Sequence, residues 1–184
     1  MNRGEALELL KNRVKNDVLV KHCLASEAIM SALAGRLGRD AGLWSLAGLL
    51  HDLDFESTKD NPSKHGLETA GMLGAMGFPA EAIDAIKGHN AEALGIQRTT
   101  EFAKALTCAE TVTGLVVATA LVQPDKKVAS VKPSSVRKRM KEKSFARNVN
   151  RGMIMLCEEI GVPLDEFIEL SVGAMKGIST DLGL

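Results

Sequence analysis

All four histidines of this 184-residue chain lie in its first half. His51 and Asp52 are adjacent and close the apolar stretch 46–50, and an isolated acid, Glu110, follows downstream. In chain order the candidate ligands are His22, His51, Asp52, His65, His89 and Glu110. Imidazole nitrogens and carboxylate oxygens set among apolar residues are the groups from which transition-metal hydrolase sites are built. Each histidine alone is more often an ordinary core or surface residue, but together the six predict a metal centre.

Glu110 is the residue that is hardest to explain without a metal. It is the only charged residue from Ala105 through Pro124. An ionised carboxylate that is buried without a partner costs on the order of several kcal/mol. The side chain must therefore reach solvent, lie against a cation from another segment, or bind a metal, and we favour the metal.

A helical His51-Asp52 pair leans over the preceding turn, where Gly48 is three residues before the histidine and four before the aspartate. A residue without a side chain leaves space there, and we expect the ion to occupy it. On this interpretation Gly48→Leu abolishes metal binding and leaves the protein helical.

Two further histidines follow, each near basic residues. We expect His65 in the first turn of a helix, where the helix dipole favours the neutral, metal-binding imidazole, and His89 at the end of the next helix. Lys59 and Lys64 lie between the doublet and His65, and Arg98 follows His89. Because loops beside a metal site commonly contact phosphate, these three are candidate substrate-binding residues, with solvated surface side chains as the alternative.

The elements that must position these residues are helices, since apolar residues recur at three- and four-residue spacing nearly throughout. We expect helices near 4–15, 17–37, 41–52, 65–76, 80–89, 99–122, 134–143, 145–160 and 164–178. Ser63 and Ser134 are plausible N-caps. β-Branched residues are dense from 112 to 122, so a strand is the main alternative there, although the length of the segment favours a helix.

The length allows one all-α domain, 1–184, with a metal-binding core at about 17–122 and a helical extension at about 131–180. Formal charge balances at 23 basic against 23 acidic residues, which gives no global argument for nucleic acid or a membrane. Residues 126–151, however, hold ten Lys or Arg against one acid. Such a run is most commonly a solvated helix face. The alternatives are that it lines one side of the active-site cleft or binds an acidic partner.

The cellular setting that we expect is the cytoplasm. The N-terminus lacks the order of a signal peptide, and the most apolar run, 112–122, is too short to cross a bilayer. Cys23, Cys108 and Cys157 have no CxxC spacing and indicate reduced thiols. With one Trp, five Phe and no Tyr, stacking platforms for nucleic acid are not expected.

The order of the candidate ligands resembles that of the HD superfamily of metal-dependent phosphohydrolases, in its HDIG-like form. The stretch Ala47-Gly48-Leu49-Leu50-His51-Asp52 is similar to that family's apolar helix ending in the His-Asp doublet, and Cys108-Ala109-Glu110-Thr111 is similar to its final Ala-Asp segment. The resemblance covers about residues 18–115 and implies a compact helical bundle with ligands converging from different helices. One departure is Glu110, which stands where the family has an aspartate.

Carried over by position, the resemblance implies one metal held by His22, His51, Asp52 and Glu110. His65 and His89 are similar to the extra ligands of two-metal members, in which the doublet aspartate bridges both ions. Asp52, His65 and His89 would then be the catalytic residues, and Fe, Mn, Zn or Co the divalent metal. The implied activity is hydrolysis of a small phosphate ester or nucleotide by a metal-bound hydroxide, as a phosphomonoesterase or phosphodiesterase. The alternatives are an HD-type di-iron oxygenase and a non-catalytic metal- or ligand-binding module, the latter motivated by Glu110.

Overall fold

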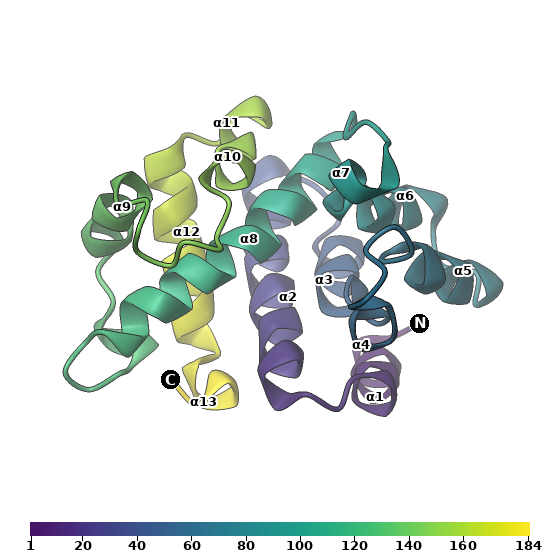
Figure 1. The fold of residues 1–184 in the computed structure, drawn as a ribbon, viewed down its shortest axis with the longest axis horizontal. Helices are drawn as coiled ribbons and strands as arrows, with labels where there is room; N and C mark the ends of the chain where they lie inside the picture. The colour runs from purple at the N-terminus through teal and green to yellow at the C-terminus, as the bar shows by residue number, and fades with distance from the viewer.

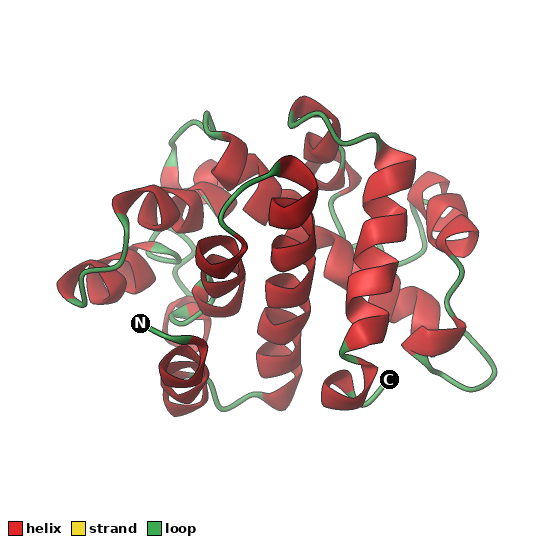
Figure 2. Ribbon diagram, turned by 180° about the vertical axis from the view of Figure 1, so that it is seen from behind, coloured by secondary structure: helices red, strands yellow, loops and turns green.

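The computed structural model describes all 184 residues as an all-helical bundle without strands, as the sequence predicts (Figures 1 and 2). The elements follow one another in the order α1 (Arg3–Arg13), α2 (Asp17–Leu37), α3 (Ala41–Leu50), α4 (Phe55–Thr58), α5 (Leu67–Ala75), α6 (Ala80–His89), α7 (Ala91–Leu94), α8 (Glu101–Leu121), η1 (Val128–Ser130), α9 (Pro133–Lys141), α10 (Arg151–Ile154), α11 (Leu156–Glu159), α12 (Leu164–Gly177) and α13 (Ser179–Leu182).

Two long helices, α2 and α8, form the centre of the bundle, and α3 packs along α2 (Figure 1). The start of α2 is fixed by Asn16, whose side chain accepts hydrogen bonds from the amides of Val18 and Leu19. Its end is fixed by Gly38 in the left-handed conformation at φ 66°. Thr100 caps α8 through the amide of Ala103. These caps set the positions of the helices that carry His22 and Glu110.

The segment 112–122 continues α8 and is not a strand, as its length favours. Threonines along α8 form hydrogen bonds within the helix. The hydroxyls of Thr107, Thr111 and Thr119 donate to the carbonyls four residues earlier, at 2.8, 2.7 and 2.7 Å. These bonds satisfy the polar side chains of a helix that lies in the core.

The prediction of one helix over 145–160 is wrong. Residues 143–149 form turns, and two one-turn helices, α10 and α11, follow. Ala146 has φ 44°, which no helix accommodates, and the side chain of Asn150 starts α10 by accepting from the amide of Gly152. The guanidinium of Arg151 donates to the carbonyls of Ala146 and Val149, both at 2.7 Å, and of Phe145. The guanidinium thus donates to backbone carbonyls that backbone amides would satisfy in a helix.

Three expectations about helix starts are also wrong. No helix begins at Ser63, and His65 lies in a turn before α5, whose N-cap is Gly66 at φ 85°. Ser134 is inside α9, because Pro133 occupies the first helical position after Lys132. The structure adds four short helices that the sequence pattern does not reveal, namely α4, α7, η1 and α13.

The helical extension packs on the core through α12, which contacts both α2 and α8 (Figure 2). Buried residues from α2, α8 and α12 belong to one hydrophobic cluster. Taken as whole helices, α2 and α8 are long and apolar enough to cross a membrane, which corrects the expectation based on 112–122 alone. Both lie in the core instead, with 44% and 61% of their most apolar window buried.

Gly48 lies where α3 crosses the backbone of α2, and the expectation that its vacant side chain leaves room for an ion is wrong. A Cβ there would meet the carbonyl oxygen of Ser26 at 2.8 Å and Cα of Glu27 at 3.0 Å. The absent side chain therefore permits close helix packing.

We expect Gly48→Ala to lower the free energy of unfolding by about 2–3 kcal/mol, because the added methyl must push two helix backbones apart. Urea unfolding followed by circular dichroism measures this. The matched control is Gly35→Ala, since nothing lies within 4 Å of a Cβ at that exposed position of α2. The control should be stabilised by up to about 1 kcal/mol, and equal effects at both positions would contradict the packing argument.

Candidate metal centre

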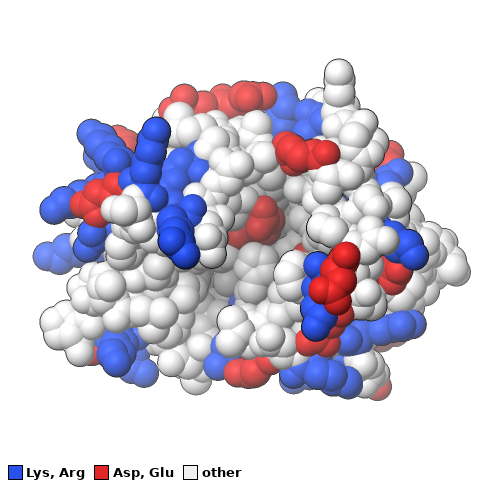
Figure 3. Space-filling view, in the orientation of Figure 1, with Lys and Arg blue, Asp and Glu red and all other residues white.

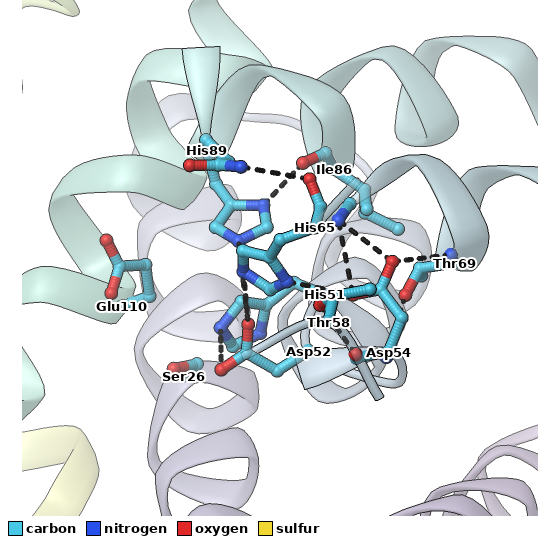
Figure 4. A network of polar contacts seen from close by, with 12 residues as sticks. Ser26, His51, Asp52, Asp54, Thr58, His65, Thr69, Ile86, His89 and Glu110 are labelled. Atoms are coloured by element: carbon cyan, nitrogen blue, oxygen red, sulfur yellow. Dashed lines mark hydrogen bonds and ion pairs between the residues drawn. The ribbon is translucent and has the colours of Figure 1, made fainter. Parts of the chain in front are cut away.

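The four histidines come together from four segments of the chain. His22 is on α2, His51 follows the last residue of α3, His65 lies in the turn before α5, and His89 ends α6. Asp52 follows His51 and is 5% exposed. Figure 4 shows His51, His65 and His89 gathered around the Asp52 carboxylate.

Each imidazole is held through its Nδ1 atom by an oxygen. His51 Nδ1 donates to the carbonyl of Gly48 at 2.8 Å, and His89 Nδ1 to that of Ile86. His65 Nδ1 donates to Oδ1 of Asp54 at 2.8 Å. These partners fix the tautomer, so that Nε2 is the nitrogen left to ligate a metal.

His22 is oriented in the same way through a hydroxyl. Its Nδ1 lies 2.9 Å from Oγ1 of Thr113, and that hydroxyl donates to the carbonyl of Glu110 at 2.6 Å. Because the single hydroxyl proton goes to the carbonyl, Thr113 accepts from His22 Nδ1, and the Nε2 atom of His22 is directed to Asp52.

The two oxygens of Asp52 each face a pair of Nε2 atoms. Oδ2 lies 3.7 Å from His22 Nε2 and 3.4 Å from His51 Nε2. Oδ1 lies 3.2 Å from His65 Nε2 and 3.5 Å from His89 Nε2. We call these the His22/His51 half-site and the His65/His89 half-site. Each satisfies the geometry of a possible metal-binding triad, with the ligand atoms within 4.8 Å of one another.

The spacing of the donors within each half-site suits a cation. The Nε2 atoms of His22 and His51 are 3.2 Å apart, and those of His65 and His89 are 2.8 Å apart. Ligands bound at about 2.0–2.2 Å to one ion lie about 3 Å from each other. When His22 and His51 are neutral, two lone pairs face each other across that gap with no proton between them. A positive ion would relieve this repulsion, so the donor set fits one or two divalent metals.

Burial and neighbouring charges have opposite effects on the pKa values of His51 and Asp52. Burial lowers the pKa of His51 to about 3, despite the adjacent carboxylate of Asp52. Burial would raise the pKa of Asp52, but the surrounding histidines outweigh it and hold that pKa well below its usual value. His51 is therefore neutral and Asp52 ionised near pH 7, which are the forms that bind a metal.

His65 differs from the expectation of a neutral imidazole. Burial lowers its pKa, but hydrogen bonds to Asp52 and Asp54 dominate and raise it to about 9. The helix dipole that was expected to favour the neutral form is not at His65, because α5 begins two residues later. The proton on His65 supplies positive charge beside Asp52, and a metal at this half-site would have to displace it.

Glu110 lies apart from the cluster, on its α8 side (Figure 4). Its Oε2 is 3.9 Å from Nε2 of His22, and its Oε1 lies within hydrogen-bond distance of the Thr111 hydroxyl, whose proton goes to the carbonyl of Thr107. Burial raises the pKa of Glu110, and the nearby His22 offsets part of that effect. The side chain is 21% exposed, so it reaches solvent as well as the His22 imidazole. Of the three outcomes expected for this carboxylate, the structure shows access to solvent.

Asp54 is a member of the site that the sequence reasoning missed. It is 1% exposed and accepts hydrogen bonds from the amides of Gly66 and Thr69, both at 2.9 Å, besides the one from His65. The carboxylate thereby fixes the turn that carries His65. The available signal was the alternation His51-Asp52-Leu53-Asp54, in which a second acid follows two residues after the first.

The three basic residues considered for substrate binding lie in different settings. Lys59 and Lys64 are exposed in the loop before His65. Arg98 is mostly buried: its guanidinium donates to the carbonyl of Gly88 at 2.8 Å and pairs with Glu92 at 2.8 Å. Arg98 therefore stabilises the end of α6 where His89 lies.

The basic segment 126–151 forms one side of the face seen in Figure 3, over α9 and the turns that follow it. The centre of that face is a hollow with acidic atoms in it and mostly uncharged walls. Several arginines of the segment serve the fold, since Arg137 pairs with Asp165 and Arg139 with Glu142. Its exposed cations are Lys126, Lys127, Lys132, Lys138, Lys141, Lys143 and Arg147.

The HD domain family model matches residues 19–116, more than half of the chain. The chain therefore belongs to the HD domain family, whose members are mostly metal-dependent hydrolases. The match contains both half-sites and Glu110, and it ends before the helical extension. Neither the curated proteins nor the solved structures give a significant match.

Proposed function

We propose that the protein is a metal-dependent phosphohydrolase that cleaves a small, nucleotide-sized phosphate ester as a phosphomonoesterase or phosphodiesterase. The observation that carries the proposal is the convergence of four Nε2 atoms on the two oxygens of Asp52, with every Nδ1 atom held by an acceptor. Two pairs of imidazole nitrogens on either side of one carboxylate are suited to holding divalent ions.

The metal would be held by His22 and His51 with Oδ2 of Asp52, and by His65 and His89 with Oδ1. Two divalent ions at these positions would supply an activated water and stabilise the charge that develops on the phosphate oxygens. With nitrogen and oxygen donors and no thiolate, the set suits Fe, Mn, Zn or Co. The part played by the protein is to align the imidazoles through their Nδ1 partners, to keep His51 neutral, and to shield the cluster largely from water.

Glu110 is positioned to act beside the His22/His51 half-site. At 3.9 Å from His22 Nε2 it is placed to complete the ligands of that half-site after a small movement of its side chain, or to orient a water there. Burial raises the pKa of this carboxyl above its usual value, which is the direction expected of a group that exchanges protons with a water. In the chain order of the family, this is the position of the last ligand.

The test uses purified protein loaded with Mn²⁺ or Fe²⁺ and assayed with p-nitrophenyl phosphate and bis-p-nitrophenyl phosphate. We expect hydrolysis of at least one ester and none from the double variant His51→Ala/Asp52→Ala. Activity that survives the double substitution would refute the proposal. Oxygen consumption by the iron form without ester cleavage would favour a di-iron oxygenase, and tight metal binding without either activity would favour a non-catalytic module.

We further propose that the protein acts in the cytoplasm on a small molecule, without nucleic acid or membrane partners. The three cysteines are free and buried, which suits a reducing compartment. Exposed aromatic side chains on which bases would stack are scarce, since Phe55 is the one aromatic residue among the exposed large hydrophobic residues.

A further inference from the structure

A cavity of about 390 Å³ adjoins the metal centre between α2, α8 and α13. His22 and Thr113, which hydrogen-bond to each other in the centre, belong to its wall. Further lining residues lie on the same helix faces as these two. Val18 and Ala25 of α2 are four residues before and three after His22, and Val117 of α8 is four residues after Thr113. The cavity therefore adjoins the His22/His51 half-site through His22 and through Thr113, which orients that imidazole.

The surface of this cavity is apolar. Besides the residues above, Leu121 and Leu182 line it, and Val18 and Leu121 are 75% and 50% exposed. Among the polar side chains, Lys21 is paired with Asp17 at 2.9 Å, and the hydroxyl of Thr113 is shared between His22 and the Glu110 carbonyl. Apart from the remaining N–H groups of Lys21, the side chains thus leave no unpaired donor or acceptor for a ligand. They expose apolar surface that no other part of the chain covers.

We infer that the cavity binds an apolar alkyl or aryl group of the substrate, whose phosphate lies at the metal centre; this inference rests on the proposed phosphohydrolase function. The volume is in the range of small-molecule sites. A nucleobase presents several donors and acceptors that these walls leave unpaired, and leaving them unpaired on binding weakens affinity. An alkyl or aryl group loses no hydrogen bonds there and gains from leaving water.

The test measures binding of unbranched alkylphosphonates, from methyl to hexyl, to the full-length Mn²⁺-loaded protein by calorimetry. Phosphonates keep the anionic phosphorus group and are not hydrolysed, so binding is measured separately from turnover. We expect each added methylene to tighten binding about fourfold until the cavity is filled. A nucleoside phosphonate should bind more weakly than hexylphosphonate.

Two variants connect this dependence on chain length with the cavity. Val117→Trp fills it and Leu121→Asp places a charge in its wall, and both should reduce the gain per methylene from about fourfold toward none. Met76→Trp, at an exposed residue outside this cavity, is the matched control and should keep the full dependence. Leu121 is half exposed, so its variant remains informative if Val117→Trp fails to fold.

Equal affinity for methyl- and hexylphosphonate, the absence of phosphonate binding, or an unchanged chain-length dependence in both folded variants would overturn the inference. Tighter binding of the nucleoside phosphonate would also overturn it. The proposed function is separable from this result. Chain-length-dependent binding without cleavage of any ester would refute the proposed function and support the cavity assignment. Ester cleavage without any dependence of binding on chain length would support the function and refute the cavity assignment.

Discussion

Replacement of Asp52 by asparagine is expected to reduce phosphoester hydrolysis by at least about a thousandfold. Asp52 is the one side chain shared by both half-sites, with each oxygen 3.2–3.7 Å from two Nε2 atoms. Asparagine keeps the shape but removes the negative charge and one of the two acceptor oxygens. A loss of about 4 kcal/mol of transition-state stabilisation, the scale expected of a metal site, corresponds to that factor. Steady-state kinetics and elemental analysis of the same preparation measure activity and metal content together.

The matched control is Asp60→Asn, which makes the same chemical change at an exposed acid of the following loop. We expect it to keep both metal content and activity. Asp52 is buried, so thermal unfolding of each variant should accompany the kinetics. A folded Asp52→Asn protein with full metal content and turnover would mean that the carboxylate does not join the two half-sites.

The helical architecture could be predicted from the sequence because it depends on local spacing. Apolar residues at three- and four-residue intervals predict a helix over 17–37, and α2 has these bounds in the structure. The error over 145–160 has a different origin. There the backbone carbonyls are satisfied by the side chain of Arg151, which meets carbonyls from several separate residues only after folding. Periodicity carries no information about such a contact.

The ligands could be proposed from residue type and order, whereas their grouping around Asp52 could be proposed only from the resemblance to the HD superfamily and not from local spacing. That Asp52 faces two pairs of imidazoles depends on where the turn before α5 meets the end of α6, and no local pattern specifies it. The interpretation of Gly48 failed for the same reason. The backbone of α2 fills the space beside it, and nothing in the spacing of α3 indicates how closely another helix approaches.

Asp54→Ala is expected to lower the free energy of unfolding by about 3–5 kcal/mol. The substitution leaves the amides of Gly66 and Thr69 without their acceptor and removes the partner of His65 Nδ1, all at a position that is 1% exposed. The turn that carries His65 should then lose its fixed conformation. Because a residue that orients a ligand commonly contributes a factor of about 10–100 in metal affinity, binding at the His65/His89 half-site should weaken by that amount.

Metal binding at the His22/His51 half-site should not weaken, because the Nδ1 atoms of His22 and His51 are held by Thr113 and Gly48 and not by Asp54. Calorimetric titration of the variant with Mn²⁺ should therefore change from two binding events to one at concentrations that saturate both half-sites of the unmodified protein. Glu68→Ala is the control. Glu68 is an exposed acid in the first turn of α5, and its carboxylate accepts a hydrogen bond from Ser57 but from no residue of either half-site. Its stability should change by less than about 0.5 kcal/mol. Equal weakening of both binding events in Asp54→Ala would show that the two half-sites are not positioned independently, and that the carboxylate supports the whole cluster through Asp52.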